Sequence, residues 1–158
     1  MTPYSIIAEF ISFSIAGDVS SGKMCFILLV EDNSTFRNSL KEMLSLRFPD
    51  LRIGEASDGD EALEKVETAN PDIIFMDIRL PGKNGLELTR TIKEVDPGIE
   101  VAILTSYDIP EYREAAFQCG ASQFFTKGDV GSDEIANFVM STLLHRGKNP
   151  GLRVFLKR

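Results

Sequence analysis

Asp-Ile-Ile-Phe-Met-Asp, at residues 72–77, is followed directly by Ile-Arg-Leu-Pro-Gly-Lys-Asn-Gly at residues 78–85. The first part is a short apolar run, which is typical of a strand buried on both faces of a parallel sheet. The second part contains Pro and Gly, which favour a loop. An acidic residue, Asp77, therefore lies where a predicted buried strand ends, and the same pattern recurs along the chain.

Other apolar runs predict four more strands, at residues 25–30, 51–56, 101–104 and 124–126. Apolar residues at helical spacing predict helices at 34–47, 85–95 and 110–119, one after Ser57 and one that begins at Ser132 or Asp133. Ser34 and Ser57 are the predicted caps of the first two helices. Five strands that alternate with five helices imply a parallel sheet with helices on both faces.

Ligands of open parallel sheets bind beyond the carboxyl ends of the strands. Glu31 and Asp32 follow the first predicted strand, and Asp77, Thr105 and Lys127 lie at the ends of the third, fourth and fifth. If the strand order is 2-1-3-4-5, these groups meet at one edge. Each of them alone is more often a helix cap, a loop charge or a surface residue. Their shared position at successive strand ends favours a site.

Three carboxylates and one ammonium group leave this edge with uncompensated negative charge. Two like charges ~4 Å apart repel by about 4 kcal/mol at the effective dielectric of a protein surface. A hard divalent cation would neutralise them, and oxygen ligands suit Mg²⁺ better than Zn²⁺. A carboxylate beside Mg²⁺ and a lysine is suited to nucleophilic attack on a phosphoryl group. The hydroxyl of Thr105 would donate to another phosphoryl oxygen.

Length and composition narrow the class of protein. The chain has 158 residues, of which 43% are apolar, so one domain with a packed core is expected. The net charge of −7 argues against a nucleic-acid binder, which normally carries a basic face. Cys25 and Cys119 lie in apolar stretches and fit no metal or disulfide spacing, so we interpret them as buried thiols of a reducing cytoplasm.

Three segments are expected along the chain. Residues 1–23 form an N-terminal extension that is disordered, loosely docked or the product of a mis-assigned start, residues 24–146 form the domain, and residues 147–158 form a short basic tail. No run is long and apolar enough to span a membrane. Glu9 interrupts the apolar start, and a basic leader region is missing, so a signal peptide is not expected.

Four ordered motifs, at residues 27–33, 76–85, 104–106 and 120–127, resemble those of response-regulator receiver domains of two-component signal transduction, including the chemotaxis regulators. The resemblance covers residues 25–146. It implies a flavodoxin-like three-layer α/β sandwich, with a five-stranded parallel sheet of order 2-1-3-4-5 and five helices.

The resemblance also implies a role for each motif residue. Asp77 would be the phosphorylated aspartate. The Mg²⁺ ligands would be the carboxylates of Glu31, Asp32 and Asp77 and the backbone carbonyl of Arg79. Thr105 and Lys127 would hold the phosphoryl group, and Phe124 would be the switch aromatic, although the residues alone fit a core phenylalanine nearly as well.

The implied partner is a sensor histidine kinase, and phosphorylation would change the surface of helix 110–119, strand 124–126 and the last helix. That surface would serve a downstream protein partner, a missing output domain or a phosphorylation-dependent homodimer. Binding of nucleic acid by this chain, membrane association and an independent metabolic activity are not expected. The chain would catalyse only its own phosphorylation and dephosphorylation.

Three alternatives remain open at this stage. One is a degenerate receiver that binds partners without phosphorylation, which the intact Asp77, Thr105 and Lys127 disfavour. Another is the truncated receiver of a DNA-binding transcription regulator. The third is an independent enzyme of flavodoxin-like fold, which the absence of a glycine-rich phosphate loop after the first strand disfavours.

The sequence departs from the family pattern after Lys127. Gly128 stands where many relatives have a proline that is reached through a cis peptide, so we expect this loop to follow another path. The positions of Arg79 and Tyr107 are variable in the family. We hypothesise that these two large side chains obstruct the attacking water and lengthen the phosphorylated state.

Overall fold

A computed structural model describes residues 24–147 of the chain. The predicted extension at residues 1–23 and all but the first residue of the predicted tail at 147–158 lie outside the described residues. Within residues 24–147, no helix is long and apolar enough to cross a membrane.

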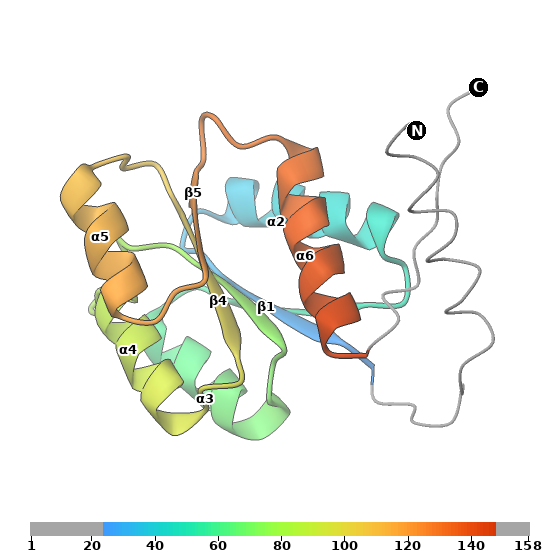
Figure 1. Ribbon diagram of the computed structural model, residues 1–158, viewed down its shortest axis with the longest axis horizontal. Coiled ribbons are helices and arrows are strands. Elements are labelled where there is room, and N and C mark those ends of the chain that lie inside the picture. Colours follow the sequence, from blue (N-terminus) through green and yellow to red (C-terminus); the bar gives the residue numbers. More distant parts are fainter. Residues whose placement is uncertain (1–23, 148–158) are drawn as a thin grey trace.

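The described residues form one parallel sheet with helices on both faces (Figure 1). The strands are β1 (Phe26–Val30), β2 (Arg52–Ala56), β3 (Ile73–Met76), β4 (Glu100–Thr105) and β5 (Gln123–Thr126). The helices are α2 (Ser34–Arg47), α3 (Gly59–Ala69), α4 (Gly85–Val95), α5 (Pro110–Gln118) and α6 (Ser132–His145). The strand order is β2-β1-β3-β4-β5, which confirms the expected fold.

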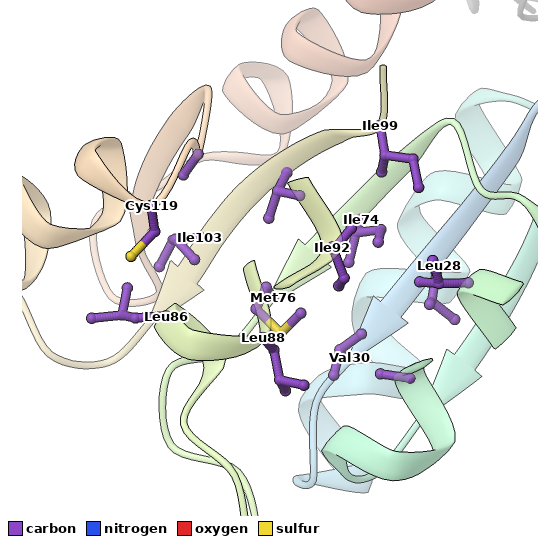
Figure 2. Packing of buried hydrophobic residues seen from close by; sticks show 14 of the residues in the cluster. Leu28, Val30, Ile74, Met76, Leu86, Leu88, Ile92, Ile99, Ile103 and Cys119 are labelled. Atoms are coloured by element: carbon purple, nitrogen blue, oxygen red, sulfur yellow. The ribbon is translucent and has the colours of Figure 1, made fainter. Parts of the chain in front are cut away.

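Alternate residues of each central strand point to opposite faces of the sheet, and each face has its own buried cluster. Leu28, Val30, Ile74 and Met76 pack against α3, α4 and α5, and Figure 2 shows them beside Leu88 and Ile92 of α4. The intervening strand residues pack against α2 and α6. Both faces of the sheet are therefore buried at its centre, which explains why β1 and β3 consist of apolar residues only.

The first two helices begin with caps that differ from the predicted ones. Asn33, not Ser34, caps α2, because its side-chain oxygen accepts the N–H of Phe36 at 3.0 Å. Asp58, not Ser57, caps α3 by accepting the N–H of Glu61 at 2.9 Å. In each case two neighbouring residues have side chains that can cap, and only the backbone path selects between them.

The loop after β5 follows a path without a cis peptide, as expected from Gly128, since all peptide bonds within residues 24–147 are trans. The backbone N–H groups of Asp129 and Val130 both donate to the carbonyl of Thr126 at 3.0 Å. This turn brings Lys127 to the carboxyl edge of the sheet and leads into α6.

Candidate acidic site at the carboxyl edge of the sheet

The predicted site residues are held by backbone hydrogen bonds that extend the sheet beyond its strands. The N–H of Glu31 donates to Ala56 at 3.0 Å, and the N–H of Asp77 donates to Val30 at 3.0 Å. The N–H of Lys127 donates to the carbonyl of Thr105 at 2.8 Å. The main chain at these three positions is therefore fixed by the rigid sheet, which is why residues far apart in sequence converge.

Lys127 joins the two buried carboxylates of the site. Its Nζ donates to Oε2 of Glu31 and, at 3.0 Å, to Oδ2 of Asp77. The side chains of Lys127, Glu31 and Asp77 are only 12%, 6% and 9% exposed, so solvent screens this group weakly. The other Asp77 oxygen, Oδ1, accepts the N–H of Ile78 at 2.7 Å.

Burial and like charge act together on Glu31. Loss of solvent raises the pKa of the Glu31 carboxyl above its usual value, and the nearby Asp77 charge raises it further, against the lowering effect of Lys127 and of the Asn33 N–H. Burial alone would lower the pKa of Lys127, but its hydrogen bonds to Glu31 and Asp77 outweigh burial and raise it. The ammonium therefore stays charged, while burial disfavours the charged form of the Glu31 carboxyl.

The carboxylates are placed to bind a metal ion together. Glu31, Asp32 and Asp77 each offer a carboxylate oxygen, and these oxygens lie within 4.8 Å of one another. Asp32 is exposed and the other two are buried, so the set opens to solvent on one side. An all-oxygen set that keeps room for water fits the preference of Mg²⁺. The carbonyl of Arg79 stays a predicted fourth protein ligand.

Thr105 and Phe124 are both buried near this edge. Thr105 ends β4 beside Lys127, and its hydroxyl oxygen accepts the N–H of Tyr107 at 3.4 Å. The Phe124 ring lies in the cluster under α4 and α5, and the Arg113 guanidinium carbon lies 4.6 Å from its centroid. The structure therefore brings Thr105 to the site and places Phe124 inward, whereas the switch role of Phe124 stays a prediction.

Arg79 and Tyr107, which follow the predicted site residues Asp77 and Thr105, contact each other. The guanidinium carbon of Arg79 lies 3.9 Å from the Tyr107 ring centroid, which is a close cation–π contact. Arg79 follows Asp77 by two residues, and Tyr107 follows Thr105 by two. The two side chains named in the water-exclusion hypothesis thus contact each other, whereas their effect on water stays a prediction.

Sequence reasoning missed two residues that shape the site. The Phe36 ring centroid lies 4.5 Å from Nζ of Lys127, a contact that the apolar spacing of helix 34–47 does not predict. A Cβ added to Gly85 would lie 1.9 Å from the carbonyl oxygen of Asp77, so this position has no room for a side chain. For Phe36, the available signal was its position shortly after Glu31 and Asp32. For Gly85, it was the glycine that ends the motif at residues 76–85.

The family model described as the response regulator receiver domain matches residues 27–139. The chain belongs to this family. Receiver domains are parts of two-component signalling systems, so the expected class of protein is confirmed.

Curated relatives agree with this assignment. The chain is 36% identical over 124 residues to transcriptional regulatory protein LnrK of Bacillus subtilis, covering 78% of this chain and 55% of LnrK. It is 37% identical over 117 residues to the DNA-binding transcriptional activator DevR/DosR of Mycobacterium tuberculosis, covering 73% of this chain and 53% of DevR/DosR. It is 38% identical over 101 residues to chemotaxis protein CheY of Halobacterium salinarum, covering 64% of this chain and 82% of CheY.

Solved structures show the same fold. A CheY-like receiver domain from Methanospirillum hungatei matches with a TM-score of 0.72 at 24% identity, covering 78% of this chain and 97% of that one. A LuxR-family response regulator from Aurantimonas matches with a TM-score of 0.69 at 29% identity, covering 80% of this chain and 89% of that one. The chain spans about half the length of most curated relatives it matches, with shares of 43%, 59% and 55% for three of them.

Proposed function

We propose that this receiver domain is a phosphorylation switch that accepts a phosphoryl group on Asp77 from a sensor histidine kinase. The observation that supports it best is the contact of the Lys127 ammonium with both Glu31 and Asp77 at the carboxyl edge of the sheet. This arrangement brings three groups together. Asp77 is the nucleophile, the Lys127 ammonium supplies positive charge, and the Glu31 carboxylate can bind a cation.

The proposed reaction forms a mixed anhydride. One carboxylate oxygen of Asp77 forms a bond to phosphorus while the donor's P–N bond, or the P–O bond of a small acyl phosphate, breaks and its electron pair leaves with the donor. The nucleophile is a carboxylate, which carries no proton that would have to be removed. Phosphorylation removes the carboxylate charge of Asp77, with which Lys127 was paired. Lys127 then donates to a phosphoryl oxygen, and the Thr105 hydroxyl donates to another.

Mg²⁺ would be held by Glu31, Asp32 and Asp77, with the Arg79 carbonyl as a further ligand. When bound, the ion supplies positive charge that offsets the negative phosphoryl oxygens. The fit rests on the close set of three carboxylate oxygens, which carry more negative charge than the single Lys127 ammonium offsets.

The proposed output is a change in the surface formed by α5, β5 and α6. Thr105 ends β4 next to β5, and Phe124 lies in β5 beneath Arg113 of α5, so a movement of Thr105 toward the phosphoryl group is transmitted to Phe124 through adjacent strands. A downstream protein, an output domain or a second copy of this chain would read that surface. Cys25 and Cys119 are buried thiols that no disulfide joins, which supports a cytoplasmic location.

The mass of the intact protein after incubation with acetyl phosphate and Mg²⁺ tests this proposal. We expect one phosphoryl adduct, which EDTA and the substitution Asp77→Asn both abolish. Asp108→Asn is the matched control, since Asp108 is an exposed carboxylate in the loop after β4 that pairs with Arg113 and is not one of the clustered carboxylates. An adduct that survives in Asp77→Asn would refute the assignment. A folded parent that takes no phosphoryl group from acetyl phosphate or from a kinase would favour a degenerate binding module.

A second proposal concerns the whole protein. Several relatives are named as transcription regulators, and this chain matches about half of their length. This supports a receiver that controls a DNA-binding output domain. With a net charge of −7, the chain itself is expected to leave duplex DNA unshifted in an electrophoretic assay at physiological salt, and a shift would contradict this division of roles.

A further inference from the structure

The ammonium of Lys127 has an aromatic partner besides its two carboxylates. An ammonium group has three N–H donors, and within the described residues its hydrogen-bond acceptors are Glu31 and Asp77. The ring of Phe36 lies 4.5 Å from the same nitrogen, measured to the ring centroid. This distance is within the range of a cation–π interaction, which strengthens when the cation is shielded from water, as Lys127 is.

Phe36 is held in place by the start of α2. Its N–H is accepted by the side chain of Asn33 at 3.0 Å, and the N–H of Asn33 donates to Oε1 of Glu31 at 2.9 Å. Two hydrogen bonds thus connect the Glu31 carboxylate to the backbone of Phe36. The half-buried side chain of Phe36 also lines a small cavity together with Leu40, Glu31 and Asp77. The ring therefore faces the same cavity as the two carboxylates that pair with Lys127.

We propose that Phe36 is a positioning residue that holds the Lys127 ammonium at the site by a cation–π interaction. Phosphorylation of Asp77 would change the carboxylate partner of Lys127 into an acyl phosphate. The Phe36 ring carries no charge and is not part of that reaction, so, like Glu31, it is a partner of Lys127 that phosphorylation does not alter chemically. Its role in phosphoryl transfer rests on the proposed function, whereas its pairing with Lys127 does not.

A double-mutant cycle tests the pairing without any phosphoryl donor. Chemical unfolding is measured for the parent, Phe36→Leu, Lys127→Met and the double variant. We expect the two substitutions to be coupled by roughly two- to fivefold in the unfolding equilibrium constant, the range of a cation–π contact. Phe36→Tyr should retain the coupling, because a tyrosine ring also binds cations. Independent effects of the two substitutions would overturn the inference.

Stepwise fluorination of the Phe36 ring tests its role in phosphoryl transfer. Fluorine weakens the negative ring face while changing ring size little, so a purely packing role would leave the rate unchanged. We expect the rate of phosphorylation by acetyl phosphate to fall progressively, by roughly two- to fivefold across the series. Phe138→Leu is the matched control, because Phe138 is a half-buried ring of α6 that contacts Phe75 and Phe125 instead.

The two experiments separate this inference from the proposed function. If the parent takes no phosphoryl group from acetyl phosphate or from a kinase, the proposed function fails, and the cycle alone decides whether Phe36 holds Lys127. If the parent forms the adduct but the rate does not change with fluorination, the proposed function stands and the positioning role of Phe36 is wrong.

Discussion

Gly85→Ala should damage both the stability of the domain and its phosphoacceptor loop, because the new methyl group would meet backbone. A Cβ at this position would lie 1.9 Å from the carbonyl oxygen of Asp77 and 3.0 Å from Cα of Ile78. Gly85 is buried at the start of α4, and its N–H donates to the carbonyl of Ile78 at 2.7 Å. No flexible side chain can move aside, so the loop that carries Asp77 must shift by about 1 Å.

The size of the effect follows from three contributions. Overpacking a buried position costs about 1–3 kcal/mol, and weakening the Gly85–Ile78 hydrogen bond costs about 0.5–1.5 kcal/mol. The higher helix propensity of alanine returns about 1 kcal/mol at most. We therefore expect a loss of about 2 kcal/mol in the free energy of unfolding. With a urea dependence of about 1–3 kcal/mol per M for a small protein, the unfolding midpoint falls by about 1 M.

Urea unfolding and the rate of phosphorylation by acetyl phosphate measure the two effects. Gly128→Ala is the matched control, because it adds the same methyl group beside Lys127, where no atom outside the adjoining residues lies within 4 Å of the new Cβ. We expect Gly128→Ala to match the parent in both assays and Gly85→Ala to fall in both. A Gly85→Ala variant as stable and as reactive as the parent would refute the close-approach argument.

Three further predictions concern other parts of the domain. Hydrogen bonds from Lys65 and Ser57 lower the pKa of Glu61 from 4.5 to about 2, so its contribution to stability is present above pH 4.5 and is lost as pH falls toward 2. Glu61→Gln should therefore be less stable than the parent at pH 7, with the difference shrinking between pH 4.5 and 2, and a constant difference in urea unfolding would contradict this. Arg79→Ala/Tyr107→Ala should release phosphate faster, measured as decay of the phosphoryl adduct, because the stacked pair no longer obstructs water; decay at the parental rate or slower would exclude the hypothesis. Asp72→Ala should lose about 2–4 kcal/mol of stability in thermal unfolding, because its buried carboxylate accepts the Phe26 N–H and pairs with Arg146, each at 2.9 Å. Its phosphorylation rate should be unchanged, since Asp72 lies at the other end of β3 from Asp77, and a slower rate would indicate coupling across the sheet.

The convergence of the site could be predicted from the sequence because it depends on topology. Glu31, Asp77 and Lys127 each follow a buried strand, and parallel strands end at one edge whatever their side chains do. The strand order itself came from the family resemblance and was confirmed, because apolar runs alone do not determine which strands are neighbours.

The contacts between side chains could not be predicted in the same way. Neither the Phe36 ring beside Lys127 nor the stacking of Arg79 on Tyr107 follows from spacing, since both depend on rotamers and on loop paths. The helix caps illustrate the same limit at short range. Asn33 and Ser34 can both cap a helix, and the choice between them depends on the backbone conformation at the end of β1.

Localisation of the phosphoryl adduct within the chain tests the central claim most directly. Borohydride reduces an aspartyl phosphate to homoserine, so the phosphorylated protein can be reduced, digested and sequenced by mass spectrometry. We predict homoserine at position 77 only, in a sample treated with acetyl phosphate and Mg²⁺, and none when EDTA is present. Homoserine at another aspartate, or an adduct that resists borohydride, would contradict the assignment of Asp77 as the phosphoacceptor.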